Sequence, residues 1–347
     1  MDALSVDHSL PDPGEYDPEI GVVGCGSICE YHLEAYADAG YDVRALCDID
    51  RERAVALRDR FYPEATVYED HETLLANEDA EVIDATTYPE PRVGIVADAI
   101  DAGRHVLSQK PFVTDLADGR RLVERADDAG VTLAVNQNGR WAPQYRYMRA
   151  AVDAGLVGDV HCVSLERHWD KNSIAGDDIE HRLFFYYGIH VVDMVRCLLG
   201  GNPERVSAAT ARSPGQAPEE PLLGEVVLEY DSALARLTFN GDERGVEVSR
   251  GRVSGSDGTI TSEGEDQNAE TVCVHREEGT VSPALSGSWF PDGFGGAMAE
   301  LLAAVAEDRE PVHSARDNLG TVATTIAAIE SARRGEAVEP AAVERLP

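Results

Sequence analysis

Short apolar runs alternate with longer amphipathic stretches through the first 140 residues. One stretch with helical periodicity ends at Ala39, and three further stretches span 51–61, 91–103 and 115–130. Strand-length apolar runs lie between them, at 19–24, 42–48, 81–87, 105–109 and 131–138. Strands that alternate with helices at this spacing build a parallel sheet that helices cover on both faces. The first part of the chain is therefore predicted to be an α/β domain.

The pattern changes after residue 140. Helices are predicted at 141–156 and 184–201, with a strand at 158–169 and a polar loop at 170–182 between them. Five later runs alternate apolar and polar residues, at 205–211, 224–230, 233–240, 245–255 and 270–276. Such alternation is typical of antiparallel strands with one face in water. Two helices, at 293–308 and 317–335, end the pattern. We predict an α+β domain built on an open, mainly antiparallel sheet.

Acidic residues outnumber basic ones along the whole chain. Asp and Glu total 64 against 30 Lys and Arg, which gives a net charge of −34. Such a surface repels nucleic acid and anionic membranes, because phosphate contacts need Lys and Arg. The acids are spread out rather than gathered in a tail, and near molar salt their repulsion is screened within about 3 Å. We therefore expect a halophilic protein that binds neither nucleic acid nor membrane.

The sequence also bears on the compartment. The acidic N-terminus lacks the basic and apolar segments of a signal peptide, and no run of about 18 apolar residues predicts a membrane span. The six cysteines include no C-x-x-C pair, and their spacing suits neither a zinc site nor a disulfide framework. These features predict a cytoplasmic protein with reduced cysteines and no metal site.

A glycine-rich turn, GVVGCGSIC, joins the first predicted strand to the first helix. Glycines at this place let the backbone turn tightly and approach a pyrophosphate, whose charge sits at the helix N-terminus. Asp48 ends the second strand, where a carboxylate binds adenosine ribose hydroxyls and repels a ribose phosphate. The expected cofactor-binding residues of the turn are Gly24, Gly26, Ser27 and Ile28. The first domain is therefore predicted to be a Rossmann domain that binds NAD, with NADP less favoured.

Polar residues also lie at the carboxyl ends of the later strands, where doubly wound sheets bind their ligands. Thr86, Thr87, Tyr88, Gln109 and Lys110 are expected to line the nicotinamide half of the cofactor site. Lys110 is one of two lysines in a chain with 28 arginines. Its retention indicates a chemical role, because an ammonium group can shift its pKa and exchange a proton, whereas a guanidinium group stays charged.

Several segments resemble the glucose–fructose oxidoreductase / inositol dehydrogenase / rhizopine catabolism family of NAD(P)-dependent oxidoreductases. The resemblance covers about residues 19–340, and its carriers are GVVGCGSI, LCDID, AGRHVLSQKP, VNQNGRWAP and GIHVVDMVRCLLG. The Glu-Lys-Pro motif of the family, whose lysine lies beside nicotinamide and substrate, reads Gln109-Lys110-Pro111 here. Its second signature is an Asp four residues before a His. His190 matches that His, but Tyr186 stands in place of the Asp.

The resemblance implies an enzyme that transfers a hydride between nicotinamide and a secondary alcohol of a sugar, polyol or inositol-like substrate. Lys110, His190 and Tyr186 are then the expected catalytic residues, with Tyr186 and His190 on one helical face. The resemblance places Asn138 and Arg140 near the substrate, and the strand-to-loop segment WDKN adds Trp169 and Lys171. It also implies a homodimer or homotetramer that forms through the open sheet.

Two other functions stay open. Some members of the family retain NAD and use it for a non-redox reaction of the lyase, epimerase or glycosidase type, and the Tyr186 replacement keeps that alternative. A dinucleotide-binding regulatory protein is the second alternative, although Lys110 and His190 argue against it. The expected domains are a flexible lead-in at 1–18, the Rossmann domain at 19–140, the substrate and oligomerisation domain at 141–312, and a C-terminal helix and tail at 313–347 that pack back on the body.

Overall fold

A computed structural model describes residues 6–172, 181–266, 268 and 271–347. Most of the loop predicted at 170–182 lies outside these residues. The described residues form two compact units. The parallel-sheet unit comprises Leu10–Trp141 and Phe290–Leu319, and the mixed-sheet unit comprises residues 6–9, Ala142–Trp289 and Gly320–Pro347.

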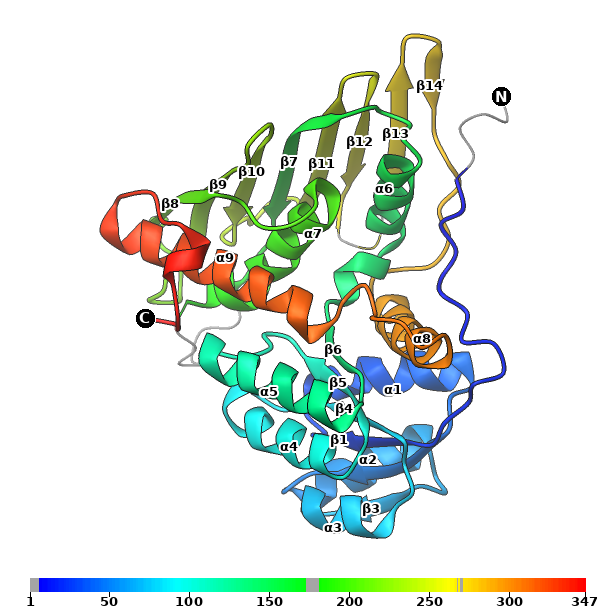
Figure 1. Cartoon of the computed structure of the whole chain (residues 1–347). Helices are drawn as coiled ribbons and strands as arrows, with labels where there is room; N and C mark the ends of the chain where they lie inside the picture. The colour runs from blue at the N-terminus through cyan, green and yellow to red at the C-terminus, as the bar shows by residue number, and fades with distance from the viewer. Residues whose placement is uncertain (1–5, 173–180, 267, 269–270) are drawn as a thin grey trace. The chain divides into compact units, whose positions relative to one another are not determined.

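Six strands form the sheet of the parallel-sheet unit, in the order β3-β2-β1-β4-β5-β6 (Figure 1). They are β1 (Ile20–Val23), β2 (Val43–Cys47), β3 (Thr66–Tyr68), β4 (Val82–Ala85), β5 (His105–Gln109) and β6 (Leu133–Asn136). The connecting helices are α1 (Ser27–Ala39), α2 (Arg51–Phe61), α3 (His71–Asn77), α4 (Pro89–Asp101) and α5 (Leu116–Ala129). Every neighbouring pair of strands is parallel. Right-handed connections then place α1 and α2 on one face and α4 and α5 on the other. The predicted doubly wound α/β fold is confirmed.

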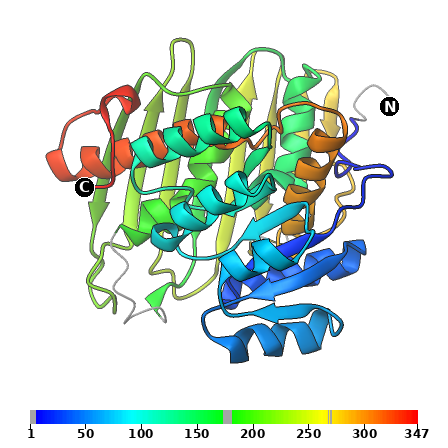
Figure 2. The ribbon, with the colours of Figure 1, turned by 60° about the horizontal axis from the view of Figure 1, so that its bottom comes forward.

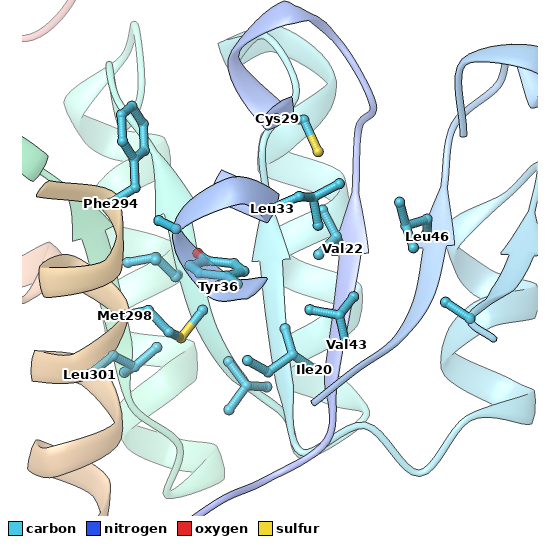
Figure 3. Packing of buried hydrophobic residues seen from close by; sticks show 14 of the residues in the cluster. Ile20, Val22, Cys29, Leu33, Tyr36, Val43, Leu46, Phe294, Met298 and Leu301 are labelled. Carbon is cyan, nitrogen blue, oxygen red and sulfur yellow. The ribbon is translucent and has the colours of Figure 1, made fainter. Parts of the chain in front are cut away.

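Helix α8 (Asp292–Ala306) also belongs to the parallel-sheet unit, whereas the expected domain limits placed it with the second half of the chain. Its side chains Phe294, Met298 and Leu301 join the core between α1 and the sheet (Figure 3). The close approach depends on small residues, because a Cβ at Gly296 would lie 2.8 Å from Cδ1 of Trp141. Local periodicity predicts such a helix but does not say which sheet it covers.

The sheet of the mixed-sheet unit has eight strands, in the order β14-β13-β12-β11-β7-β10-β9-β8. They are β7 (Val160–His168), β8 (Arg205–Ala211), β9 (Leu223–Glu229), β10 (Leu234–Asn240), β11 (Val248–Gly255), β12 (Gly258–Gly264), β13 (Thr271–Arg276) and β14 (Gly279–Val281). Only the β7–β10 pair among these is parallel, so the predicted mainly antiparallel sheet is confirmed. The strands lie side by side in both views (Figures 1 and 2).

The helices of the mixed-sheet unit are α6 (Pro143–Asp153), α7 (Ile189–Leu199) and most of α9 (Ala315–Arg334), with a 3₁₀ turn at Pro340–Ala342. The C-terminal tail is tied to β8, because Val206 and Val338 exchange backbone hydrogen bonds of 2.8 and 2.9 Å. The strands β3, β12 and β14 and the helix α3 were not predicted. Their few or polar residues, such as GTITSEG in β12, give weak periodicity. Among the described helices, none has the length and apolar character of a membrane span.

Candidate active site

The glycine-rich turn between β1 and α1 has the geometry of an anion site. Gly24 has a φ of +103°, and a Cβ there would lie 2.8 Å from Cγ2 of Thr87. Gly26 is the N-cap of α1, and a Cβ on it would meet nothing within 4 Å. Because the N-cap has no side chain, the backbone N–H groups of Ser27 and Ile28 in the first turn of α1 are available to a ligand. The turn therefore fits a phosphate group.

Asp48 lies beside the same turn. Its Oδ2 accepts a hydrogen bond of 2.6 Å from the backbone N–H of Cys25, and its Oδ1 accepts one of 2.8 Å from Asp50. The carboxylate thus links the end of β2 to the glycine turn. A carboxylate at this place can accept hydrogen bonds from two ribose hydroxyls, as the sequence predicted for NAD.

Several buried polar atoms at the carboxyl ends of β4 and β6 have no hydrogen-bond partner among the described residues. They are Thr87 Oγ1 after β4, Asn136 Oδ1 at the end of β6, both side-chain polar atoms of Gln137, and Asn138 Oδ1. An unsatisfied buried polar group costs about 1–3 kcal/mol, so these atoms are expected to bind water or a polar ligand. Tyr88 is the exposed N-cap of α4, directly after Thr87. Thr87 and Tyr88 fit the nicotinamide half of a dinucleotide, as the sequence predicts.

Lys110 follows the last residue of β5. Its backbone N–H donates a hydrogen bond of 2.6 Å to Oε1 of Gln109, so the Gln109 side chain helps to fix the backbone at Lys110. Burial, reinforced by the positive charge of Arg92, lowers the pKa of Lys110 to about 8. An amine with that pKa exists in both protonation states near neutral pH, as a proton-transfer group requires.

A buried polar network that the sequence analysis missed lies behind Gln109. His32 Nδ1 lies 2.7 Å from Oδ2 of Asp84, which also accepts a 2.7 Å hydrogen bond from the Tyr36 hydroxyl. The side-chain amides of Gln109 and Asn136 each lie 3.0 Å from Nε2 of His32. With both amides donating, Nε2 is the acceptor and Nδ1–H donates to Asp84. The available sequence signal was a His and a Tyr four residues apart in α1.

Arg140 and Asn138 lie in the 3₁₀ turn Asn138–Trp141, directly after β6. The Arg140 guanidinium donates to the carbonyl oxygen of Val312 and pairs with Asp317 at 2.7 Å. These two contacts connect the turn to the start of α9. Arg140 therefore has a structural role in addition to its predicted place near the substrate. Asn138 keeps a buried amide oxygen for a ligand.

Trp169 and Lys171 follow β7 in the mixed-sheet unit. The Lys171 ammonium lies 5.8 Å from the centre of the Trp169 ring and 5.1 Å from that of Tyr187. The two rings meet edge to face with their centroids 6.0 Å apart. The structure thus brings together two predicted substrate residues and adds Tyr187, which the aromatic run FFYYG could have indicated. Burial lowers the pKa of Lys171.

Tyr186 and His190 lie where π-helical and α-helical geometry meet. Tyr186 belongs to the π-helical turn Arg182–Gly188, and His190 to the first turn of α7. The predicted continuous α-helix therefore begins as a π-helix, a geometry that is frequent at functional sites. The His190 ring meets Trp289 edge to face at 5.5 Å, and the Arg167 guanidinium lies 4.9 Å from the centre of the Trp289 ring.

A group of possible metal ligands lies elsewhere in the parallel-sheet unit. His71, Glu72 and Asp98 each bring one ligand atom within 4.8 Å of the others. Nε2 of His71 forms a 2.9 Å contact with Oδ2 of Asp98, and the Glu72 side chain is exposed. A surface ion pair accounts for this arrangement, and we assign no metal to it.

Two family profiles match the chain. The "Oxidoreductase family, NAD-binding Rossmann fold" matches residues 19–137, and the "GFO/IDH/MocA C-terminal domain" matches residues 145–261. The D-apiose dehydrogenase of Paraburkholderia graminis is 30% identical over 344 residues, which cover 93% of this chain and 90% of that protein. The inositol 2-dehydrogenase of Salmonella typhimurium is 28% identical over 182 residues, which cover 52% of this chain and 54% of that protein.

Solved structures share the fold over nearly the whole chain. An oxidoreductase from Agrobacterium radiobacter in complex with NAD+, L-tartaric acid and magnesium has a TM-score of 0.82 at 22% identity, and the match covers 94% of this chain and 99% of that one. The scyllo-inositol dehydrogenase from Lactobacillus casei with bound NAD(H) and scyllo-inositol has a TM-score of 0.79 at 18% identity, with the same coverage. At these identities the likeness establishes the fold.

Proposed function

The chain belongs to the GFO/IDH/MocA family of oxidoreductases, and from this premise we propose which of its residues carry the reaction. The protein is an NAD(P)-dependent dehydrogenase that acts on CH–OH groups of sugars, polyols or related compounds, with NAD as its cofactor. The observation that carries the residue assignment is Lys110, an amine with a pKa of about 8 at the end of β5.

Each group of residues has a proposed task. Gly24, Gly26 and the first turn of α1 hold the pyrophosphate, and Asp48 holds the adenosine ribose. Thr87 and Tyr88 flank the nicotinamide half, and Asn138 lies near the substrate. Bound NAD supplies the acceptor for the hydride that leaves the carbinol carbon.

Proton handling falls to Lys110 and His190. Neutral Lys110 accepts the proton of the substrate hydroxyl, and His190 stabilises the developing alkoxide or relays the proton. Tyr186, with a phenolic O–H where the family has a carboxylic acid, donates a hydrogen bond and so tunes this pair. Trp169 and Lys171 offer an aromatic surface and a cation to a polyhydroxy substrate.

A spectrophotometric assay tests the proposed reaction. The protein would be purified in molar KCl and offered NAD with apiose, other aldoses, inositols and sugar acids, while absorbance at 340 nm is followed. Growth of reduced cofactor with one of these classes is the expected result and names the substrate class. Tightly bound NAD with no net reduction, together with an eliminated or epimerised product, would instead support the NAD-retaining alternative.

Asp48 is expected to set the preference for NAD over NADP. In Asp48→Asn the amide oxygen can still accept the Cys25 N–H bond, but the charge that repels a ribose phosphate is lost. We expect the ratio of NAD to NADP affinities to fall about tenfold or more, which corresponds to ~1.4 kcal/mol. Titration of each cofactor by calorimetry measures this ratio.

The matched control for that measurement is Asp50→Asn. Asp50 caps α2 and pairs with Arg53, two residues beyond Asp48, and its loss removes the same charge from the surface. Its affinity ratio should stay at the wild-type value. An equal fall in both variants would show that net charge, rather than the Asp48 carboxylate, discriminates between the cofactors.

We further propose a cytoplasmic, salt-adapted protein that assembles as a homodimer or homotetramer through the open sheet. The net charge of −34 supports salt adaptation. The ladder of exposed ion pairs across the strands, such as Arg250 with Glu263 at 2.8 Å and Arg236 with Glu166 at 3.4 Å, supports a polar interface. Light scattering across KCl concentrations measures both the mass and its salt dependence.

A further inference from the structure

Arg92, on α4, is among the largest fully buried side chains in the described part of the chain. Its Nε donates a 3.0 Å hydrogen bond to the carbonyl oxygen of Thr87, and Nη2 donates to the same oxygen. Its Nη1 donates to the carbonyl oxygens of Gln109 and Pro111. One guanidinium therefore joins the end of β4 to the two carbonyl groups that flank Lys110.

Burial of a guanidinium is costly, and an apolar side chain would fill the same space between α4 and the sheet. Here the planar fork of donors meets three convergent backbone oxygens, an arrangement that lysine or an apolar residue cannot reproduce. The same turn is held from the other side, since Oε1 of Gln109 accepts the Lys110 N–H and the Gln109 amide contacts His32. The backbone on either side of Lys110 is thus fixed by hydrogen bonds.

We propose that Arg92 is a positioning residue for the dehydrogenase reaction. Arg92 holds the turn that carries Lys110 and joins this turn to the Thr87 segment. This proposal rests on the proposed role of Lys110. The residue next to Lys110 adds to the argument, because position 109 carries an amide where the family motif has a carboxylate. The positive charge of Arg92, on α4, therefore acts on the lysine without an opposing charge at position 109.

The titration of Lys110 supports the same role. Burial is the larger cause of its lowered pKa and Arg92 is the second. Among the described residues, the buried network behind the turn adds the ionisable groups His32 and Tyr36 on α1 and Asp84 on β4, which lie beyond the neutral Gln109 side chain. Removal of Arg92 takes away a like charge and loosens the turn toward water, and both changes raise the pKa of the lysine.

Two lysines in the whole chain make this titration directly measurable. Protein labelled with ε-¹³C lysine gives two side-chain signals by NMR, and Lys171→Arg assigns them. In the wild type the Lys110 signal should titrate near pH 8. In Arg92→Met its midpoint should move to higher pH, and kcat should fall about 10- to 100-fold as the amine is misplaced, with the circular dichroism spectrum as a check of the fold.

Arg104→Met is the matched control, because Arg104 also donates to a backbone carbonyl, that of Glu78, but precedes the opposite end of β5. There the Lys110 midpoint and kcat should stay unchanged. An Arg92→Met protein that is less stable but keeps the wild-type Lys110 midpoint and kcat would overturn the proposal, since Arg92 would then serve only the fold.

Arg92→Lys decides the question if Arg92→Met does not fold. It keeps a positive charge and loses the fork, so kcat should still fall, while the Lys110 midpoint should rise less than in Arg92→Met because the like charge remains. The third lysine signal of this variant is identified by comparison with the wild-type spectrum. Wild-type kcat in this variant would overturn the positioning role. The NMR midpoints need no substrate, and so they test this proposal separately from the proposed function. The proposed function is contradicted if Lys110→Ala keeps full turnover, regardless of the result for Arg92.

Discussion

Lys110→Ala is expected to lose about 10²- to 10⁴-fold in kcat, the range that proton transfer by a positioned side chain contributes. The change removes the amine that follows β5 and keeps the hydrogen bond from the backbone N–H of residue 110 to Gln109 Oε1. NAD affinity and thermal stability should therefore stay close to wild type. Rates of NAD reduction with the substrate found in the panel assay measure the loss.

Lys171→Ala is the natural control, because it removes the other lysine of the chain and the same charge. Lys171 contacts Trp169 and Tyr187, so we expect mainly a raised KM. The pH profile adds a separate check. Since the base must be neutral, kcat/KM of the wild type should rise with pH through about 8, the pKa of Lys110. Full turnover in Lys110→Ala would show that another group accepts the proton.

The second large effect is expected at the glycine turn. Gly26 has an extended backbone with a φ of −75°, and a Cβ there meets nothing within 4 Å. Gly26→Ala should change stability by less than about 0.5 kcal/mol. Its methyl group would stand where the backbone must approach the pyrophosphate, so NAD affinity should fall about 100-fold, or ~2.7 kcal/mol. Thermal melts and calorimetric titration with NAD measure the two effects separately.

Gly24→Ala should affect both quantities. Its φ of +103° is a conformation that alanine rarely adopts, and the new Cβ would lie 2.9 Å from the backbone nitrogen of Thr87. We expect a loss of about 1–3 kcal/mol in the free energy of unfolding, in addition to weaker NAD binding. If Gly26→Ala bound NAD as well as wild type, the pyrophosphate would not approach the chain at this residue.

The local features of the site followed from the sequence because each depends on near neighbours in the chain. The glycine turn lies between a strand and a helix, and the bounds of β5 and α2 agree with the predicted runs HVLSQ and RERAVALRDRF. The parallel order of the strands follows from strand–helix alternation and the handedness of the connections. The catalytic assignment of Lys110 rested on lysine scarcity and strand-end position, and it stays a prediction.

The contacts between buried side chains that lie far apart in the sequence could not be predicted from local patterns. His32 contacts Gln109 and Asn136, which lie 77 and 104 residues away in the sequence. No periodicity encodes a contact at that separation. The π-helical turn that carries Tyr186 was also missed, since its residues fit an α-helical pattern equally well. The turn packs closely against the sheet, since a Cβ at Gly188 would lie only 3.2 Å from the Phe239 ring in β10. Such a packing contact cannot be read from a local pattern.

The sequence by itself determined a Rossmann domain, an open, mainly antiparallel sheet and the family, and it predicts the strand ends at which a dinucleotide would bind. These depend on hydrophobic periodicity and on short motifs, which act within one element and its neighbours. Only the tertiary structure decided that α8 completes the core of the parallel-sheet unit and that Arg92 holds the Lys110 turn. A buried charge is tolerated only where donors and acceptors converge, and three carbonyl groups converge on Arg92 only after β4, β5 and α4 have packed.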